Sequence, residues 1–517
     1  MTKRVHIGKV YLYCLLAALL CLLVCSKSSP LYPINDWTDA NAYLSSGKGM
    51  LAGRVMYRDL YEHKGPLLYA LHALACLIDA GSFLGVFTLE VLAVSLYLLA
   101  GYALLTLYGA GRTALYALPL LALAMASSQS FQMGDSAEEL CMPMLAWSLY
   151  SLLRWYRLQA PARMGSGWLL ANGALMACVL WVKFTMLGMY LPWLAMLLWH
   201  MARRGAWRDV VSTLGWLLLG ALLATLPWLL YFGVNGAIGD WLKTYLYDNL
   251  FLYQDQPSLG LMARGKAMLQ AGLAWVLGNP LYTVPMLFGL LWLTWGRKAI
   301  TDAAASPEAA GDGKAADAGI SRWEITLLWS GFAVLALGVF IGGKSYVYYG
   351  LILAAFLPFA ALPVCLWAEK LPRLGKRAQL AALCGCAVLA AGLGLWLTPN
   401  RADFLKPRAD TMQYRFAAIV NQTPGATLLN YGFMDAGFYT ACGIAPSVKY
   451  FHQTNMNLPE MYEEQARYIA QGLTDYVITR GKQPETITQR YTLIATEDAP
   501  PDFWYQKVYL YRRNAQP

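Results

Sequence analysis

Charged side chains are scarce in this sequence: Asp, Glu, Lys and Arg make up 14% of its 517 residues, whereas 58% are hydrophobic. A soluble domain usually contains about 25% charged and about 45–50% apolar residues. The composition therefore excludes an ordinary soluble protein and indicates a polytopic membrane protein. The net charge of +10 does not indicate a nucleic-acid partner, because the Lys and Arg residues stand in short runs between apolar segments, as membrane topology requires.

Patterns typical of metal sites and disulfide frameworks are also absent from the sequence. The five His residues are scattered, and most of the ten Cys residues lie in apolar runs. Cys384 and Cys386 are close together but have no His partners. We therefore expect no disulfide framework and no metal held by His and Cys.

What the sequence has instead is a series of long apolar runs. About twenty apolar residues cross a bilayer as a helix, and the runs lack the alternation of barrel strands, so they predict about eleven transmembrane helices. The predicted helices are 8–25, 86–108, 113–128, 139–157, 167–183, 185–201, 210–232, 275–296, 325–342, 346–367 and 378–397.

Positive charge sets the orientation of these helices. With an odd number of crossings, every basic cluster falls on the side of the N-terminus, which is then cytoplasmic. The clusters are Lys3/Arg4, Arg112, Arg154/Arg157/Arg163, Arg203/Arg204/Arg208, Arg297/Lys298 and Lys370/Arg373/Lys376/Arg377. The sequence thus predicts a multi-pass protein of the plasma or inner membrane whose C-terminal residues lie outside the cytoplasm.

The chain divides into two predicted domains. Residues 1–397 form a transmembrane domain with a long first outer loop, 26–85, and residues 398–517 form a small extracytoplasmic α/β domain. The second domain contains four runs of strand length, "ATLLNYG", "DYVITR", "YTLIAT" and "KVYLYRR", and a helix, "LPEMYEEQARYIAQG", with Pro and Glu in its first turn. The Ala/Gly/Asp-rich segment 300–321 predicts a flexible cytoplasmic loop.

Two acids follow the first apolar run, Asp36 and Asp39 in "INDWTDANAY". On a helix their spacing puts them on one face. Their position allows two interpretations. Either Asp36 is a helix cap and Asp39 is a charge in the first turn of the helix, or both are catalytic carboxylates. The following "DANAYLSSGKGMLAGRVMYRDLYEHKGPLLY" favours catalysis, because it places Arg58 and Lys64 in the same loop, before a Gly-Pro turn and an apolar helix.

A second acid group, Glu138 and Glu139 in "FQMGDSAEELCMP", faces outward under the predicted topology. Adjacent residues on a helix point about 100° apart, so only one of the two can face a given site. The alternative is a helix start, with Ser136 as the cap and Glu139 completing a capping box.

Three lysines stand at or near membrane edges: Lys64, Lys344 in "GGKSYVYY" and Lys183 in "WVKFTMLG". Lys64 and Lys344 are either interface anchors or phosphate ligands. Lys183 lies deep enough to need a partner, so it is a pore-side functional group or a member of a buried ion pair.

Taken in order, these motifs resemble the GT-C class of glycosyltransferases, which includes the protein O-mannosyltransferases and the lipid A aminoarabinose transferases. The sequence is most similar to a bacterial branch of that superfamily, in the first loop and in "GDSAEELCMP" and "YGFMDAGFY". The similarity covers the first four spans well and the rest mainly by topology.

The resemblance implies a GT-C fold and an enzyme that moves a hexosyl or pentosyl group from a polyprenyl-phosphate donor to a glycan, lipid or protein acceptor of the cell envelope. It assigns the catalytic base to Asp39, with Asp36 as the weaker match, and the second acid to Glu138 or Glu139. It implies no cofactor and leaves dependence on a divalent metal open.

The same resemblance assigns the donor phosphate to Lys64, in a turn where Gly65 replaces the first proline of the family's Lys-Pro-Pro sequence. Arg58 and Lys344 are further candidate phosphate ligands, since cations stabilise charge that develops on a departing phosphate.

Other functions fit the sequence less well. A transporter or flippase of lipid-linked glycans favours charges at the bilayer midplane and internal repeats, and the sequence shows little of either apart from Lys183. A glycan polymerase or ligase usually lacks a terminal α/β domain of this size, and a scaffold needs neither acid group. "YGFMDAGFY" and "KYFHQTNMN" are either an acceptor surface or contacts that dock the terminal domain; we favour docking.

Overall fold

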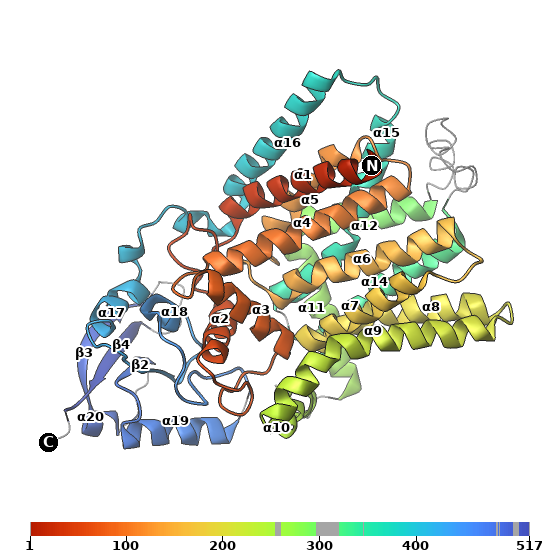
Figure 1. Cartoon of the computed structure of the whole chain (residues 1–517). Coiled ribbons are helices and arrows are strands. Elements are labelled where there is room, and N and C mark those ends of the chain that lie inside the picture. The colour runs from red at the N-terminus through yellow and green to blue at the C-terminus, as the bar shows by residue number, and fades with distance from the viewer. Residues whose placement is uncertain are drawn as a thin grey trace. The chain divides into compact units, whose positions relative to one another are not determined.

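The computed structural model describes residues 2–253, 260–295, 320–344, 346–456, 458–481, 484, 486–499 and 506–515. The predicted flexible loop, 300–321, lies outside them except for its last two residues. The chain forms two compact units (Figure 1). The first, here called the membrane unit, consists of Met1–Ser26, Glu90–Leu226 and Ser258–Ala402. The second, here called the mixed unit, consists of Lys27–Leu89, Pro227–Pro257 and Asp403–Pro517.

Long helices run through the membrane unit, and a helix lies in each range predicted to cross the bilayer. They are α1 (Thr2–Cys25), α4 (Leu84–Leu107), α5 (Ala114–Ala126), α6 (Ala137–Leu158), α7 (Ser166–Lys183), α8 (Tyr190–Ala202), α9 (Trp207–Val234), α11 (Leu261–Gly278), α12 (Pro280–Trp295), α14 (Arg322–Phe340), α15 (Pro358–Ala368) and α16 (Lys376–Leu397). Two 3₁₀ segments, η1 (Phe184–Met189) and η3 (Val347–Phe356), lead into α8 and α15. The helix α1 packs against α5 and α16.

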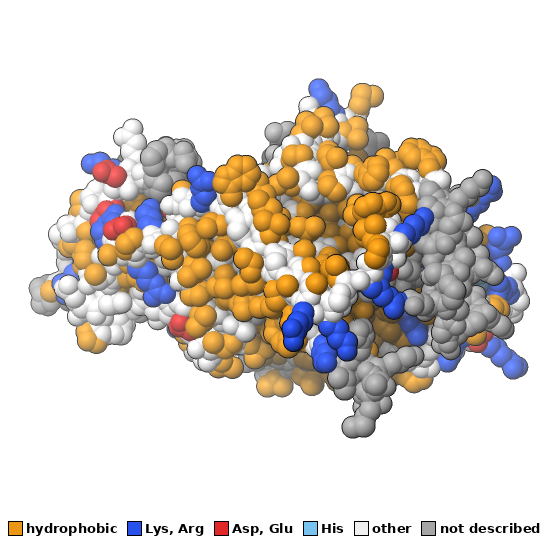
Figure 2. Space-filling view, turned by 90° about the horizontal axis from the view of Figure 1, so that it is seen from above, with side chains coloured by type: hydrophobic (Ala, Val, Ile, Leu, Met, Phe, Trp, Pro, Cys, Tyr) orange, Lys and Arg blue, Asp and Glu red, His pale blue; other side chains and the backbone are white. Residues whose placement is uncertain are grey.

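The membrane character of these helices follows from their length and composition. Among the described residues, seven helical stretches are long and apolar enough to cross a membrane, or eight if α11 and α12 form one span. Other predicted ranges hold shorter apolar helices, such as α5 with 13 residues. Hydrophobic side chains cover much of the face shown in Figure 2, and Lys and Arg side chains gather where the apolar surface ends. The prediction of a polytopic α-helical membrane protein is confirmed.

Two predictions about the spans differ from the structure. The ranges 167–183 and 185–201, predicted as two spans, form one continuous helical stretch of 37 residues, Ser166–Ala202. The range 275–296 is not one helix, because α11 ends at Gly278 and α12 begins at Pro280, with a bend of 105° between them. Proline has no N–H to donate and disfavours helical geometry in the residue before it. Asn279 stabilises the break, since its side chain accepts a hydrogen bond from the Ser130 N–H (2.7 Å) and donates one to the carbonyl of Trp275 (2.8 Å).

The mixed unit contains a four-stranded sheet in the order β1-β2-β4-β3. All four predicted strands are present, as β1 (Leu428–Tyr431), β2 (Tyr476–Arg480), β3 (Tyr491–Asp498) and β4 (Lys507–Arg513). Strands β1 and β2 are parallel, with Leu429 opposite Val477, whereas β2–β4 and β3–β4 are antiparallel. A parallel pair needs a crossover, and the predicted helix α19 (Pro459–Gln471) lies within it.

The other elements of the mixed unit are mostly short helices. They are α2 (Thr38–Leu51), α3 (Pro66–Ile78), α10 (Ile238–Leu242), the π-helical η2 (Lys243–Leu252), η4 (Pro399–Asp403, at its border), η5 (Arg408–Asp410), α17 (Met412–Val420), α18 (Phe438–Cys442) and α20 (Ile487–Arg490). Leu429, Val477 and Tyr511 of the sheet form a core with Met461 and Ile469 of α19.

The first outer loop is ordered by close packing of α2 on α3. A Cβ atom placed on Gly47 of α2 would lie 2.6 Å from the backbone nitrogen of Ala73 and 2.6 Å from the carbonyl carbon of His72, both in α3. Only glycine allows the two helices to approach this closely.

We expect Gly47→Ala to destabilise the protein by about 1–3 kcal/mol, because the added methyl group overlaps backbone that cannot rotate away. The measurement is the thermal unfolding midpoint of the detergent-purified protein. Gly239→Ala is the matched control, since a Cβ there meets nothing within 4 Å. Equal midpoints for the two variants would contradict the packing argument.

Candidate active site

Asp39 lies in the first turn of α2, where the positive end of the helix dipole stabilises a carboxylate. The residue is 7% exposed. Its Oδ2 accepts a hydrogen bond from the Tyr43 hydroxyl, one turn later, at 3.2 Å. The ring of Tyr43 packs edge-on against His72 of α3. The candidate base is therefore a buried carboxylate held by packing between two helices of the mixed unit.

Asp36 has a different environment, and the prediction that it caps α2 is wrong. The residue that precedes the helix is Trp37, which makes no capping hydrogen bond through its side chain. Asp36 instead pairs with the buried ammonium of Lys27 at 2.6 Å, and Asp403 pairs with the same ammonium at 2.6 Å. Asn35 shapes the turn, because its Oδ1 accepts the Trp37 N–H. Asp36 thus lies outside the helix and does not share a helical face with Asp39.

Lys64 lies in the loop between α2 and α3 and is 6% exposed. Its Nζ lies 3.1 Å from Nε2 of His63. Its backbone is held on both sides, because its N–H donates to the Tyr69 hydroxyl (2.8 Å) and its carbonyl accepts from the Tyr57 hydroxyl (2.7 Å). Gly65 has an extended backbone and Pro66 is the first residue of α3, so the Gly-Pro sequence forms a well-defined helix start.

The loop that carries Lys64 stores backbone strain at Tyr57. This buried residue has φ 69°, a left-handed conformation that bulky side chains rarely adopt. Its N–H donates to the carbonyl of Leu60 at 2.7 Å. Such strain persists only where the surroundings over-determine the conformation, and it is typical of ligand sites.

The pKa of His63 is lowered by burial and by the positive charge of Lys64, and these effects outweigh the charges of Glu62 and Asp39, which raise it. His63 is therefore neutral near pH 7. Tyr43, whose hydroxyl donates to Asp39, lies 6.4 Å from Tyr69 between ring centroids, and the Tyr69 hydroxyl accepts the N–H of Lys64. The predicted base and the predicted phosphate ligand therefore belong to one buried cluster.

Arg58 is at the surface of the mixed unit, with 43% of its side chain exposed. Its Nε and Nη2 bind the two carboxylate oxygens of Asp59 at 2.8 and 2.9 Å, and Nη1 donates to the carbonyl of Asn235 at 2.7 Å. The guanidinium is therefore occupied by protein groups.

The second acid group lies in the membrane unit, at the start of α6. Ser136 caps this helix, as predicted, by accepting the Glu139 N–H at 3.0 Å. The reciprocal half of the predicted capping box is replaced, because Glu139 Oε2 accepts the N–H of Asp135 rather than that of Ser136. Both Glu138 and Glu139 are fully buried.

Glu90 of α4 joins this acid group and is not among the predicted site residues. Its Oε1 accepts the same Asp135 N–H at 2.8 Å, and both its oxygens accept from the Ser26 hydroxyl. A Cβ on Gly134 would lie 2.2 Å from Glu90 Oε1, so glycine is required at that position. An isolated ionisable residue within an apolar run is a functional signal in a membrane protein, and Glu90 in "LGVFTLEVLAV" carries that signal.

Lys183 forms an ion pair with Glu138, and its side chain and that of Glu138 are 11% and 0% exposed. Its Nζ also lies 3.6 Å from the ring centre of Tyr349, in range for a cation–π contact. Of the two predicted roles for Lys183, membership of a buried ion pair is confirmed. The pairing also distinguishes the two glutamates. Glu138 pairs with a cation, whereas Glu139 accepts the N–H of Asp135, which Glu90 also accepts.

Lys344 belongs to the membrane unit and is partly exposed, with its Nζ 5.7 Å from the ring centre of Tyr346.

The predicted site residues thus fall into two sets. Asp36, Asp39, Arg58 and Lys64 belong to the mixed unit, and Glu138, Glu139 and Lys344 belong to the membrane unit. In the part of the chain that the structure describes, no three or more His, Cys, Asp or Glu side chains cluster as metal ligands would.

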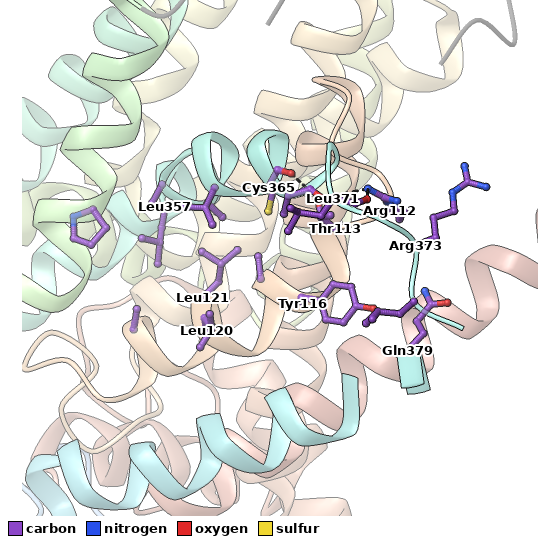
Figure 3. A pocket seen from close by; sticks show the side chains of 18 of the residues that line it. Arg112, Thr113, Tyr116, Leu120, Leu121, Leu357, Cys365, Leu371, Arg373 and Gln379 are labelled. Atoms are coloured by element: carbon purple, nitrogen blue, oxygen red, sulfur yellow. Dashed lines mark hydrogen bonds between the residues drawn. The ribbon is translucent and has the colours of Figure 1, made fainter. Parts of the chain in front are cut away.

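A groove of about 850 Å³ lies in the membrane unit between α5, α12, α15 and the segment that leads into α16 (Figure 3). Leu120, Leu121 and Leu357 lie toward one end, and Arg112, Arg373 and Gln379 lie toward the other. Its lining includes none of the predicted acids or lysines, so the groove is separate from the predicted site residues.

Solved structures share the fold of this chain and confirm the predicted fold class. Two crystal structures of ArnT from Cupriavidus metallidurans are similar to it over 97% of this chain and 98% of theirs. The apo structure matches with a TM-score of 0.60 at 14% identity, and the structure bound to undecaprenyl phosphate matches with a TM-score of 0.58 at 15% identity. No protein-family model and no curated protein matches the sequence.

We expect Lys183→Met to destabilise the protein by about 3–5 kcal/mol, because it leaves the carboxylate of Glu138 buried without its cation. The double variant Lys183→Met/Glu138→Gln removes both charges and should regain most of that loss. The thermal unfolding midpoint measures both effects. A double variant no more stable than Lys183→Met would show that the two residues are not energetically coupled.

Proposed function

We propose that this protein is a membrane glycosyltransferase that takes a sugar from a polyprenyl-phosphate donor and transfers it to a hydroxyl acceptor of the cell envelope. The observation that carries the proposal is the buried cluster that joins Asp39, a candidate base, to Lys64, a candidate phosphate ligand, at the start of α2 and before α3. The fold shared with ArnT, which has been crystallised with undecaprenyl phosphate, supports a donor of that class.

The proposed reaction is a displacement at the anomeric carbon of the donor sugar. Asp39 takes the proton from the acceptor hydroxyl, and the acceptor oxygen forms the new glycosidic bond. The bond between the anomeric carbon and the phosphate oxygen breaks, and the electron pair leaves with polyprenyl phosphate. A positioned general base contributes about 10²–10⁴-fold to such a step, and the ammonium of Lys64 stabilises the negative charge of the leaving phosphate.

The remaining predicted residues take supporting parts in this proposal. Asp36 holds Lys27 rather than a substrate, and Arg58 is a second phosphate ligand only if it releases Asp59. Glu138 and Glu139 remain the candidates for the second acid, and Lys344 remains a candidate cation. We place the reaction on the outer side of the membrane and the N-terminus in the cytoplasm, on the basis of the distribution of Lys and Arg between the spans.

Replacing Asp39 by Asn should reduce sugar transfer at least about 100-fold, because the amide cannot accept the proton. The measurement is mass spectrometry of cell-envelope glycans from a deletion strain complemented with each variant at matched protein levels. Asp36→Asn is the control and should retain transfer, since Lys27 keeps Asp403. Wild-type glycans with Asp39→Asn would overturn the assignment of the base, and unaltered glycans in the deletion strain itself would overturn the proposed function.

Replacing Lys64 by Ala should weaken the binding of undecaprenyl phosphate to the purified protein by about 10–100-fold, since hydrogen bonds to charged groups contribute about 1.5–3 kcal/mol. Binding is followed by thermophoresis in detergent. Lys406→Ala, a lysine of the mixed unit whose side chain is 42% exposed, is the control and should bind like the wild type. Unchanged binding by Lys64→Ala would mean that the lysine is an anchor rather than a phosphate ligand.

A further inference from the structure

Glu62, the residue two before Lys64, is 2% exposed and lies between two histidines. Its Oε1 is 2.9 Å from Nδ1 of His63, and its Oε2 is 3.4 Å from Nε2 of His452. Oε1 also accepts the backbone N–H of His63 at 2.8 Å. His452 comes from "KYFHQTNMN", almost four hundred positions later in the chain, and the histidines are 2% and 0% exposed.

The hydrogen-bond partners define the tautomers of both imidazoles. A lysine ammonium can only donate, so Nε2 of neutral His63 accepts from Lys64 and Nδ1 carries the proton that faces Glu62. His452 has the opposite arrangement, because its Nδ1 accepts the backbone N–H of Asp435 at 3.2 Å and Nε2 carries the proton. Both histidines therefore place a protonated ring nitrogen beside the same buried carboxylate, in polar contacts at 2.9 and 3.4 Å that lack hydrogen-bond geometry.

The segment around Asp435 also contacts the helix that carries Asp39. Oδ2 of Asp435 accepts a hydrogen bond from the hydroxyl of Ser45 in α2 at 2.7 Å. Its Oδ1 accepts from the side chain of Asn430 at 3.0 Å and from the N–H of Gly437 at 3.1 Å. The C-terminal part of the mixed unit thus reaches the Lys64 loop through His452 and reaches α2 through Asp435.

We propose that Glu62, His63 and His452 are positioning residues that hold the Lys64 ammonium at the donor phosphate. The proposal rests on the proposed function, because it takes Lys64 as the phosphate ligand. His63 accepts one N–H of the ammonium and so sets its direction. Glu62 orients the His63 ring, and His452 orients Glu62. The motifs "YGFMDAGFY" and "KYFHQTNMN" then dock the C-terminal segment onto the first loop and keep the phosphate ligand in place.

This arrangement makes phosphate binding sensitive to acid. The groups that face His63 are Glu62 and Lys64 on its own loop, Asp39 on α2, and, after η2, the ring of Tyr253, 5.2 Å away between centroids. The pKa of His63 lies below its ordinary 6.5 because of burial and Lys64. At acidic pH the Nε2 atom of His63 takes up a proton. The imidazolium then repels the Lys64 ammonium, from which Nε2 accepted a hydrogen bond at higher pH.

The test measures the affinity of the purified protein for undecaprenyl phosphate between about pH 5 and pH 8, the range around the ordinary imidazole pKa. We expect the wild-type affinity to fall on the acidic side of pH 6.5. In Glu62→Gln the affinity at pH 7.5 should be about tenfold weaker, as expected for a misdirected charged hydrogen bond. The acid transition should also move to lower pH, because the charge that raises the pKa of His63 is gone.

His452→Leu and His452→Gln form a second pair that separates positioning from folding. Leucine removes the polar group beside the Glu62 carboxylate and should weaken binding about tenfold, whereas the glutamine amide can place an N–H in the same position and should restore most of the affinity. Thr440→Val is the control, since Thr440 bonds Asn41 of α2 at 3.0 Å without touching Glu62; its affinity and pH profile should match those of the wild type.

The outcomes distinguish this proposal from the proposed function. The positioning proposal alone would be overturned if Lys64→Ala binds poorly while Glu62→Gln and His452→Leu both keep the wild-type affinity and pH profile. If His452→Gln binds as poorly as His452→Leu although both fold, the argument from the polar contact between His452 and Glu62 fails. A wild-type protein that does not bind undecaprenyl phosphate would overturn the proposed phosphate site itself.

Discussion

The pairing of buried charge is the constraint on which the rest of this structure depends. Transfer of an ion from water into a protein interior costs several kcal/mol unless a partner compensates for it. In the membrane unit Lys183 meets Glu138, and in the mixed unit Lys27 meets both Asp36 and Asp403. The Lys183–Glu138 and Lys27–Asp403 pairs join segments that are distant in the chain, so neutralising the charge also determines which helices and loops come together.

The same constraint explains why the candidate site is built from polar groups that contact one another. Lys64 contacts His63, His63 contacts Glu62, and Glu62 contacts His452 through polar atoms of their side chains. The neutral imidazole adds no charge of its own beside the lysine, and the carboxylate of Glu62 lies on the far side of the imidazole ring. Rigidly held charges of this kind stabilise a leaving group without reorganisation during the reaction.

Much of the architecture could be predicted, because apolar runs and short strand-like runs are local patterns. Most of the helices and all four strands follow from such patterns, and so does the need of Lys183 for a partner. The residues that the predictions miss are partners: Glu90 beside Glu139, Lys27 beside Asp36, and Glu62 with His452. Asp36 looked like a helix cap because a cap and an ion-pair partner share the same residue type and position, and only the location of Lys27 decides between them.

The sequence by itself determined that this chain is a polytopic membrane protein with four short strands in its C-terminal part, because period and hydropathy are properties of neighbouring residues. It also marked Asp39 and Lys64 as candidates, because their motifs are contiguous. The tertiary structure alone decided which charges meet. Lys27 pairs with Asp403, Ser45 bonds Asp435, and Glu62 faces His452, and contacts across such separations depend on how the whole chain packs rather than on any local pattern.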